Sequence, residues 1–216
     1  MDKTAVLERI TSTGLVPVIR AQSADEAAAV VDAIQAGGLG VLEITMTVPN
    51  AVALIADVVK RAPDALVGAG TVLDPETARA CIGAGARFVV SPALNLDTIA
   101  ACRAAGVAVL PGALTPTEVV TAWRAGADLV KVFPANAVGG ASYIKSLKAP
   151  LPQIGLVPTG GVGLTTARDF IKAGAAALGV GADLVDLAAL RRGEAAVITE
   201  RTRQFLTIVR EARAAA

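Results

Sequence analysis

The stretch LVKVFP, residues 129–134, is an apolar and β-branched run typical of a buried strand, yet it contains a lysine. Seven further short apolar runs are spaced along the chain. The eight candidate strands are LVPVIRA (15–21), VLEITM (41–46), LVGAGT (66–71), RFVVSP (87–92), VAVLPG (107–112), LVKVFP (129–134), GLVPTG (155–160) and AALGVG (176–181). Apolar strands separated by helices indicate a parallel sheet that is covered on its faces.

The segments between these runs have the periodicity of helices. Apolar residues recur at three- and four-residue spacing, and each segment ends in a glycine, as at a helix C-cap. The clearest examples are DEAAAVVDAIQAG, DTIAACRAAG, PTEVVTAWRAG and TTARDFIKAG. We predict one α/β domain over residues 1–216. Its fold would be a (β/α)8 TIM barrel with an extra N-terminal helix and a last helix near 194–214.

An open, doubly wound sheet is the alternative to the barrel. Such a sheet usually has a glycine-rich nucleotide-binding turn after its first strand. The corresponding stretch, LVPVIRAQSADEA, contains no glycine. The stretch GAGTVL (68–73) begins like that motif but has Leu73 where the last glycine should stand. We therefore favour the barrel.

Composition and charge narrow the classes of function. The chain is 54% hydrophobic and only 3% aromatic, so aliphatic side chains must fill the core. A net charge of +1 gives no electrostatic reason to expect nucleic acid or an anionic membrane surface as a partner. No apolar run approaches the roughly 20 residues that span a bilayer. MDKTAVLERI is typical of an amphipathic helix rather than a signal peptide, so we expect a cytoplasmic protein.

The chain contains no histidine, and its two cysteines, Cys81 and Cys102, lie on separate helix-like segments. The absence of histidine excludes serine–histidine hydrolases, histidine general bases and the usual zinc sites. The cysteine spacing disfavours a disulfide scaffold or a thiolate metal site. Catalysis must therefore depend on carboxylates, lysine, arginine, hydroxyls or the backbone.

Strand periodicity places one amine and one carboxylate inside the barrel. Side chains alternate between the two faces of a strand. In 129–134, Lys131 and Phe133 should point inward while the valines face the helices. In 41–46, Glu43 points inward by the same reasoning. Two polar groups in that layer are costly unless they are paired or used.

Two interpretations of this pair remain open. The pair could be a buried structural ion pair, or Lys131 could be a nucleophile with Glu43 as its proton shuttle. An attacking amine must be neutral, whereas free lysine titrates near pH ~10.4. Desolvation in an apolar interior lowers that pKa, and a nearby ionised glutamate opposes the shift. The remaining lysines lie on helices or at their ends, where we expect them to be solvated.

Glycine-rich turns follow the last two strands, in TGGVGLTTARDF (159–170) and GVGADLV (179–185). In barrels, the loops after strands seven and eight often form a phosphate site. Glycine lets backbone N–H groups approach an anion closely. The candidate phosphate-binding residues are Gly160, Gly161, Gly179, Gly181 and Ala182. The alternative is that these are tight turns into helices, with Asp183 as an N-cap.

Three polar residues should lie at the rim where the strands end. Arg20 closes the first strand and could bind a carboxylate or phosphate with its forked guanidinium. Thr71 and Thr159 end the third and seventh strands, where a hydroxyl could orient a polar substrate. A solvated arginine, and hydroxyls bonded to their own loops, are the alternatives.

Taken in order, LEITM, VGAGTV, SPALN, LPGALTPTE, KVFPA and PTGGV resemble the 2-keto-3-deoxy-6-phosphogluconate (KDPG) and 4-hydroxy-2-oxoglutarate (KHG) aldolase family over essentially the full chain. Its members are class I aldolases on trimeric (β/α)8 barrels. The resemblance implies that Lys131 forms a Schiff base and that Glu43 moves protons. It further implies two sets of binding residues. Thr71, Pro92, Phe133 and Thr159 would line the pyruvate end, and Gly160, Gly161 and Gly181 would hold phosphate through their amides.

This chain departs from the family pattern at two positions. Many KDPG aldolases have E-V-T-L-R-T, with an arginine for the substrate carboxylate, where this chain has Thr47. Arg20 could supply the missing charge. Many also have a serine where this chain has Ala182, and losing that hydroxyl removes a hydrogen bond of about 1 kcal/mol. The related phosphogalactonate aldolases also lack the arginine, but Thr159 is more similar to the gluconate type.

The expected reaction is reversible cleavage of a 2-keto-3-deoxy acid to pyruvate and an aldehyde, most simply glyceraldehyde 3-phosphate, or glyoxylate from the hydroxyoxoglutarate. We expect no metal and no cofactor, because an iminium on Lys131 would be the electron sink. The expected partners are a small 2-keto acid and identical subunits in a homotrimer. Alternatives are a phosphogalactonate aldolase, a phosphosugar isomerase or epimerase on the same barrel, and a catalytically silent metabolite-binding protein.

Overall fold

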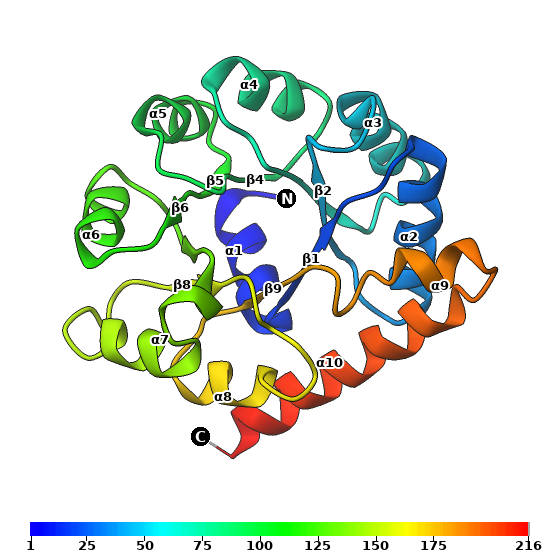
Figure 1. Ribbon diagram of the computed structural model, residues 1–216. Coiled ribbons are helices and arrows are strands. Elements are labelled where there is room, and N and C mark those ends of the chain that lie inside the picture. Colours follow the sequence, from blue (N-terminus) through cyan, green and yellow to red (C-terminus); the bar gives the residue numbers. More distant parts are fainter. Residues whose placement is uncertain (216) are drawn as a thin grey trace.

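The computed structural model describes residues 1–215, in which helices and parallel strands alternate (Figure 1). The elements are α1 (Lys3–Thr13), β1 (Leu15–Ile19), α2 (Ala24–Ala36), β2 (Val41–Thr45), α3 (Ala51–Arg61), β3 (Leu66–Gly70), α4 (Pro75–Gly83), β4 (Phe88–Val90), α5 (Leu96–Ala104), β5 (Ala108–Leu110), β6 (Gly112–Ala113), α6 (Pro116–Arg124), β7 (Val130–Val132), a 3-10 helix (Ala135–Val138), α7 (Ala141–Lys148), β8 (Leu156–Pro158), α8 (Ala167–Lys172), β9 (Leu178–Val180), α9 (Leu187–Arg191) and α10 (Ala196–Ala214). All eight predicted strand segments contain strands, and both terminal helices are present.

The strands of residues 1–215 form two parallel sheets. One has six strands in the order β5-β4-β3-β2-β1-β9, and the other has three in the order β6-β7-β8. The predicted parallel α/β fold is therefore confirmed. The predicted (β/α)8 barrel differs from this arrangement at two places. The fifth predicted strand is divided into β5 and β6, and β8 and β9 are linked only by an isolated bridge.

The division of that strand occurs at Pro111, which has no N–H to donate to a ladder. Before it, β5 pairs with β4, and after it, β6 pairs with β7. The Pro111 carbonyl still accepts a hydrogen bond from Lys131 N at 2.9 Å. At the other edges of the two sheets, β8 and β9 are joined by a parallel bridge between Thr159 and Gly179.

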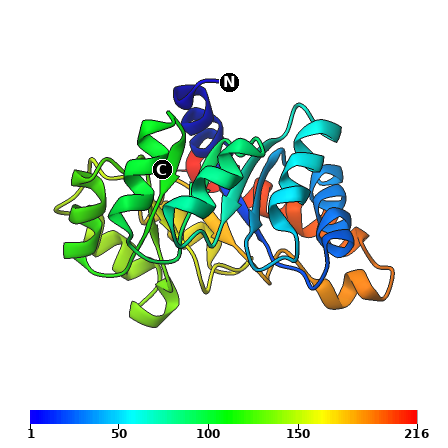
Figure 2. The same ribbon diagram turned by 90° about the horizontal axis from the view of Figure 1, so that it is seen from above.

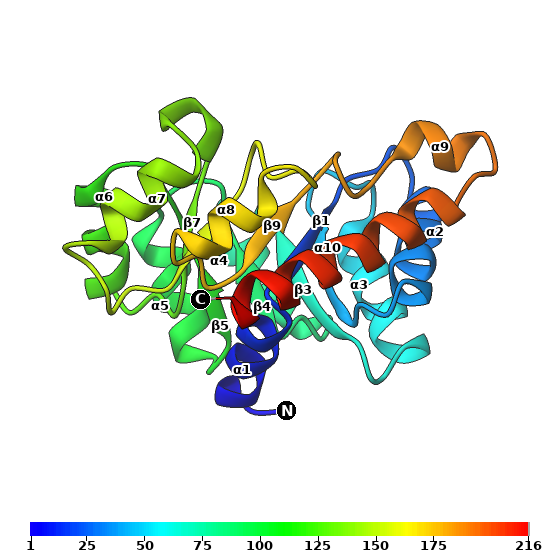
Figure 3. The same cartoon turned by 90° about the horizontal axis from the view of Figure 1, so that it is seen from below.

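Helices surround the strands in Figure 1. Figures 2 and 3 show α1 projecting from one end of the molecule, and its contacts are with β1, β2 and β5. The long helix α10 packs along α8 and α2. No helix of the described residues is long and apolar enough to cross a membrane.

Several helices end where the glycines in the sequence predicted an end. Gly85 and Gly126, which follow the C-caps of α4 and α6, have φ values of +104° and +97°. Residues with a Cβ rarely adopt this left-handed backbone, which allows the chain to leave the helix and turn toward the next strand.

Inward-facing glycines make room for large side chains between the strands. The register pairs Gly68 of β3 with Glu43 of β2 on one side and with Phe88 of β4 on the other. A Cβ at Gly68 would overlap the ring of Phe88, which is fully buried and cannot move aside easily. The glycine therefore leaves the interior space that the Phe88 ring occupies.

We predict that Gly68→Ala lowers the free energy of unfolding by about 1–3 kcal/mol, because it overpacks the interior against Phe88. Gly83→Ala is the matched control, since its Cβ would meet open space at the end of α4. That change should be neutral or stabilise by up to about 1 kcal/mol. Urea unfolding of both variants measures the effect. Equal stabilities would contradict this account of the packing.

Candidate active site

Lys131 of β7 and Glu43 of β2 meet in the interior, although they belong to different sheets. Both are buried, with 3% and 2% of their surface exposed, and Lys131 Nζ lies 3.9 Å from Glu43 Oε1. Each strand alternates as predicted, so both polar side chains share the interior while their strand neighbours pack under the helices. The structure therefore brings the two predicted groups together.

Gly70, at the end of β3, creates the space that Glu43 occupies. A Cβ at this position would overlap the Glu43 carboxylate. The sequence reasoning did not identify Gly70 as part of the site. A signal was present, because a glycine two residues after Gly68 lies on the same inward face.

The Glu43 carboxylate is not fully hydrogen-bonded. Its Oε1 is buried and accepts no hydrogen bond from the described residues. Burial raises the pKa of Glu43 above its usual value, and the positive charges of Lys131 and Arg20 only partly offset that effect. A buried carboxyl with a raised pKa and an unused oxygen is suited to accepting and returning a proton.

A cavity of about 210 Å³ lies near this pair, although neither Lys131 nor Glu43 is among its lining residues. Phe133 and Thr159 are among its lining residues, and the Phe133 ring centroid lies 5.5 Å from Lys131 Nζ. Thr159 is buried, and its hydroxyl packs against Gly179, where a side chain would collide with it. Gly179 therefore makes room for Thr159, and it also lines the cavity.

The two glycine turns form the far wall of the same cavity, which Gly160, Gly161, Gly181 and Ala182 line. The N–H groups of Gly161, Gly181 and Ala182 donate no hydrogen bond to another described residue. Asp183 does not act as the N-cap that the alternative interpretation required. Asp186 instead caps α9, accepting from Ala189 N at 2.9 Å.

Arg20, Thr47 and Pro92, which the sequence made candidates for substrate binding, lie in different surroundings. Arg20 is exposed, lines the cavity and makes no ion pair with the described residues. Thr47 is exposed, and its hydroxyl lies 2.6 Å from that of Thr45. Pro92 is half-buried, and its carbonyl packs against Gly112, the register partner of Lys131. Only Arg20 of these three borders the cavity.

Thr71 has a strained backbone at the end of β3. It is half-buried with a φ of +57°, which is unfavourable for a β-branched residue. Such strain costs about 1–3 kcal/mol and is found most often at functional sites. The structure around Thr71 therefore holds it in this strained conformation at the end of β3.

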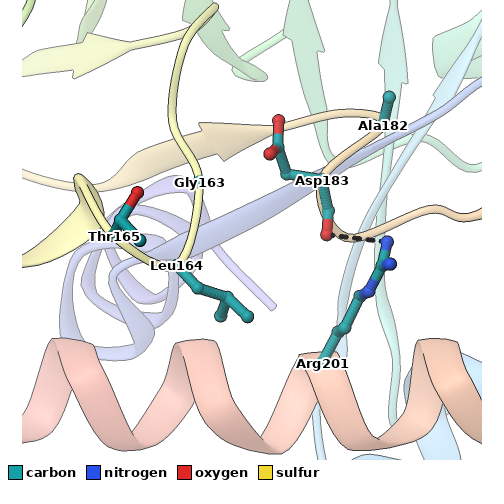
Figure 4. Close-up of a pocket in the computed structure, with 6 residues that line it drawn as sticks. All are labelled: Gly163, Leu164, Thr165, Ala182, Asp183 and Arg201. Carbon is teal, nitrogen blue, oxygen red and sulfur yellow. Dashed lines mark hydrogen bonds between the residues drawn. The ribbon is translucent and has the colours of Figure 1, made fainter.

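A second cavity of about 440 Å³ adjoins the first, sharing Ala182 and Asp183 as lining residues. Figure 4 shows it between the two glycine turns, with Arg201 of α10 on its other side. Arg201 donates to the Asp183 carbonyl at 3.2 Å and pairs with Asp186 at 3.0 Å. This cavity was not predicted from the sequence, because it depends on how α10 packs beside the two turns.

The two cysteines and Lys148, the other side chains considered as nucleophiles, are buried or hydrogen-bonded. Burial raises the pKa of the Cys81 and Cys102 thiols to about 11, so neither is a nucleophile at neutral pH. Burial lowers the pKa of Lys148, but its amine donates to the Pro152 and Ile154 carbonyls. Within residues 1–215, no three His, Cys, Asp or Glu side chains group as a metal site would require.

Comparison with known proteins identifies the class. The family model described as KDPG and KHG aldolase matches residues 6–201. The chain is 33% identical over 202 residues to the KHG/KDPG aldolase of Escherichia coli K12, covering 94% of this chain and 95% of that protein. It is 39% identical over 176 residues to the 2-dehydro-3-deoxy-6-phosphogalactonate aldolase of the same strain, covering 81% and 85%.

A solved structure that is similar to this chain is also that of a KDPG aldolase. The KDPG aldolase of Legionella pneumophila, with pyruvate captured as a covalent carbinolamine intermediate, matches with a TM-score of 0.82 and 28% identity. The match covers 92% of this chain and 96% of that one. The protein is therefore a lyase of the aldolase class. It belongs to the KDPG and KHG aldolase family, which confirms the resemblance noted in the sequence.

We predict that Glu43→Gln changes how stability depends on pH. The folded-state pKa of Glu43 lies above its usual 4.5, so the folded protein holds this proton more tightly than the unfolded chain does. Ionisation above pH 4.5 therefore costs the folded wild type stability, by about 1.4 kcal/mol per unit of pKa difference, whereas glutamine cannot ionise. Wild-type stability relative to the variant should fall as pH rises from that value.

Urea unfolding of both proteins between pH 4 and 8 measures this difference. A difference that stays constant, or that grows in favour of the wild type as pH rises, would contradict the dominance of burial. It would mean that the attraction of Lys131 controls the carboxyl.

Proposed function

We propose that this protein is a class I aldolase that cleaves 2-keto-3-deoxy-6-phosphogluconate to pyruvate and glyceraldehyde 3-phosphate, and 4-hydroxy-2-oxoglutarate to pyruvate and glyoxylate. The observation that carries the proposal is the buried Lys131 amine 3.9 Å from a carboxylate oxygen without a hydrogen-bond partner. In a purely structural ion pair, we would expect that oxygen to accept a hydrogen bond. A proton shuttle instead needs an oxygen that is free to accept a proton from substrate or water.

In the proposed reaction, Lys131 Nζ attacks the C2 ketone, and loss of water from the carbinolamine leaves an iminium. The C3–C4 bond then breaks, its electron pair moves into the enamine, and Glu43 accepts the C4 hydroxyl proton. The aldehyde departs, and Glu43 returns a proton to C3 of the enamine. Hydrolysis of the iminium releases pyruvate and regenerates the amine. The raised pKa of Glu43 supports both proton transfers.

We assign the pyruvate part of the substrate and its carboxylate from the positions of residues at and near the cavity. Phe133 and Thr159 line the cavity and Phe133 lies near the Lys131 amine, so we place pyruvate against them, with Thr71 and Pro92 at the same rim, after the ends of β3 and β4. Arg20 is the charged group for the carboxylate, since Thr47 is neutral and already shares its hydroxyl with Thr45. No metal or cofactor is required, because the iminium accepts the electrons.

The phosphate would lie against the glycine turns. The free N–H groups of Gly161, Gly181 and Ala182 support this placement, and Gly160 and Gly179 line the same wall. Backbone amides directed into a cavity bind phosphate oxygens without any side-chain charge. Ala182 offers only its amide, where many relatives also have a hydroxyl.

We also propose how the strands close into a barrel, how the chain assembles and where it acts. The bridge between Thr159 and Gly179, and the continuity of β5 and β6 through Pro111, support one closed (β/α)8 barrel over residues 1–216. We further propose that the chain forms a homotrimer, as its family implies, and acts in the cytoplasm, where phosphorylated sugar acids are retained.

A second candidate substrate is 2-keto-3-deoxy-6-phosphogalactonate. The observations that favour it are Thr47 in place of an arginine and the 39% identity to the phosphogalactonate aldolase. Against it stand the KDPG and KHG aldolase relatives, which match 94% of this chain, and Thr159 at the cavity. We therefore place it second.

We predict that borohydride added with pyruvate attaches a three-carbon adduct to Lys131, because reduction traps the imine. Peptide mass spectrometry locates the adduct. Lys131→Arg should abolish labelling, while Lys148→Arg, which replaces a lysine whose pKa is lowered by burial, should leave it unchanged. Labelling of another lysine, or none at all, would refute the assignment and favour an isomerase or a silent binding protein.

Steady-state kinetics should rank the substrates. We expect kcat/KM to be at least about tenfold higher for the phosphogluconate than for its galactonate epimer, which corresponds to about 1.4 kcal/mol in the transition state. Coupled assay of pyruvate release from both epimers and from 4-hydroxy-2-oxoglutarate measures this ratio. The reverse order for the epimers would make the phosphogalactonate reaction the main activity.

A further inference from the structure

Asp183 is an acidic side chain at the end of the cavity where phosphate would bind. It lines both adjoining cavities and is exposed. Its carboxylate makes no hydrogen bond or ion pair with another residue in 1–215, and only its backbone carbonyl is used, by Arg201. Figure 4 shows the carboxylate directed toward the Gly163 turn and away from Arg201.

The position of this carboxylate is set by the two turns. A Cβ at Gly163 would lie 2.8 Å from Asp183 Oδ1, so the oxygen rests close to the backbone of the first glycine turn. Asp183 follows Gly181 and Ala182, whose free amides would meet a phosphate. The negative charge is therefore next to the amides proposed to bind an anion.

The surrounding charges do not give this end an excess of positive charge. Arg20 is the cation that lines the inner cavity, and Asp183 is its acidic counterpart there. Arg201 lines the outer cavity, but it is paired with Asp186. Two arginines and two carboxylates thus balance, so this end lacks the net positive charge that would strengthen the binding of a phosphate dianion by the backbone amides.

We infer that Asp183 is a specificity-determining residue that reduces the advantage of a phosphorylated substrate, so that unphosphorylated 2-keto-3-deoxy acids, which end in an uncharged hydroxyl, compete with phosphorylated ones. This inference rests on the proposed aldolase function. Repulsion from Asp183 acts on a phosphate but not on a hydroxyl, and a carboxylate can accept a hydrogen bond from a terminal hydroxyl. The missing hydroxyl at Ala182 weakens phosphate binding in the same direction.

The test compares wild type with Asp183→Asn, which keeps the side-chain shape and removes the charge. Asp64→Asn is the matched control, because Asp64 is exposed and precedes β3, at the opposite end of the strands. The substrates are 2-keto-3-deoxy-6-phosphogluconate and its unphosphorylated form, 2-keto-3-deoxygluconate.

For Asp183→Asn, kcat/KM for the phosphorylated substrate should rise about tenfold, mainly through a lower KM. The value for the unphosphorylated substrate should stay level or fall. Asp64→Asn should leave the ratio between the substrates within about twofold of wild type. An unchanged ratio in Asp183→Asn, or an equal shift in both variants, would overturn the inference.

Thermal unfolding in inorganic phosphate gives a readout that needs no turnover. Phosphate should raise the Tm of Asp183→Asn more than that of wild type or Asp64→Asn, because a ligand stabilises the state that binds it more tightly. Equal Tm shifts would contradict the role of Asp183. A folded wild type that cleaves neither substrate would instead contradict the proposed function, and the Tm shifts would still decide the inference about Asp183.

Discussion

The contact between Lys131 and Glu43 is the constraint on which the site depends. Each side chain comes from a different sheet, so their approach requires both sheets to face one interior. A buried amine and a buried carboxylate are costly separately and remain costly together unless their geometry is good. Here one Glu43 oxygen accepts no hydrogen bond from the described residues and burial raises the pKa of Glu43, so the pair is not fully satisfied.

Glycines on the inner face determine where these side chains can go. Gly70 admits Glu43, Gly68 admits Phe88 and Gly179 admits Thr159. In each case a missing side chain on one strand makes room for a large or polar one on its neighbour. Glycine weakens a strand, so three of them on inward positions indicate that space in the interior matters more than strand propensity.

The rim carries the chemistry that distinguishes this chain within its family. Thr47 and Ala182 are the two positions at which the sequence was expected to depart from the family pattern, and Arg20 and Asp183 place charges of opposite sign on one cavity. In the proposed reaction the interior pair acts on the keto group that all 2-keto-3-deoxy acids share, whereas these rim groups would contact the parts in which such acids differ. We therefore propose that reaction type and substrate choice depend on separate layers of the fold.

Much of this was predictable from local pattern. The two-residue period of strands correctly placed Lys131 and Glu43 inward, and the glycines correctly marked helix ends, because both depend on neighbours in the chain. The break at Pro111, the space beside Gly70, the unpaired carboxylate of Asp183 and the cavity reached by Arg201 were not predicted. The sequence by itself determined the order of elements and the inward face of each strand. Only the tertiary structure decided which inward groups meet and which stay unpaired, because those distances depend on residues far apart in the chain.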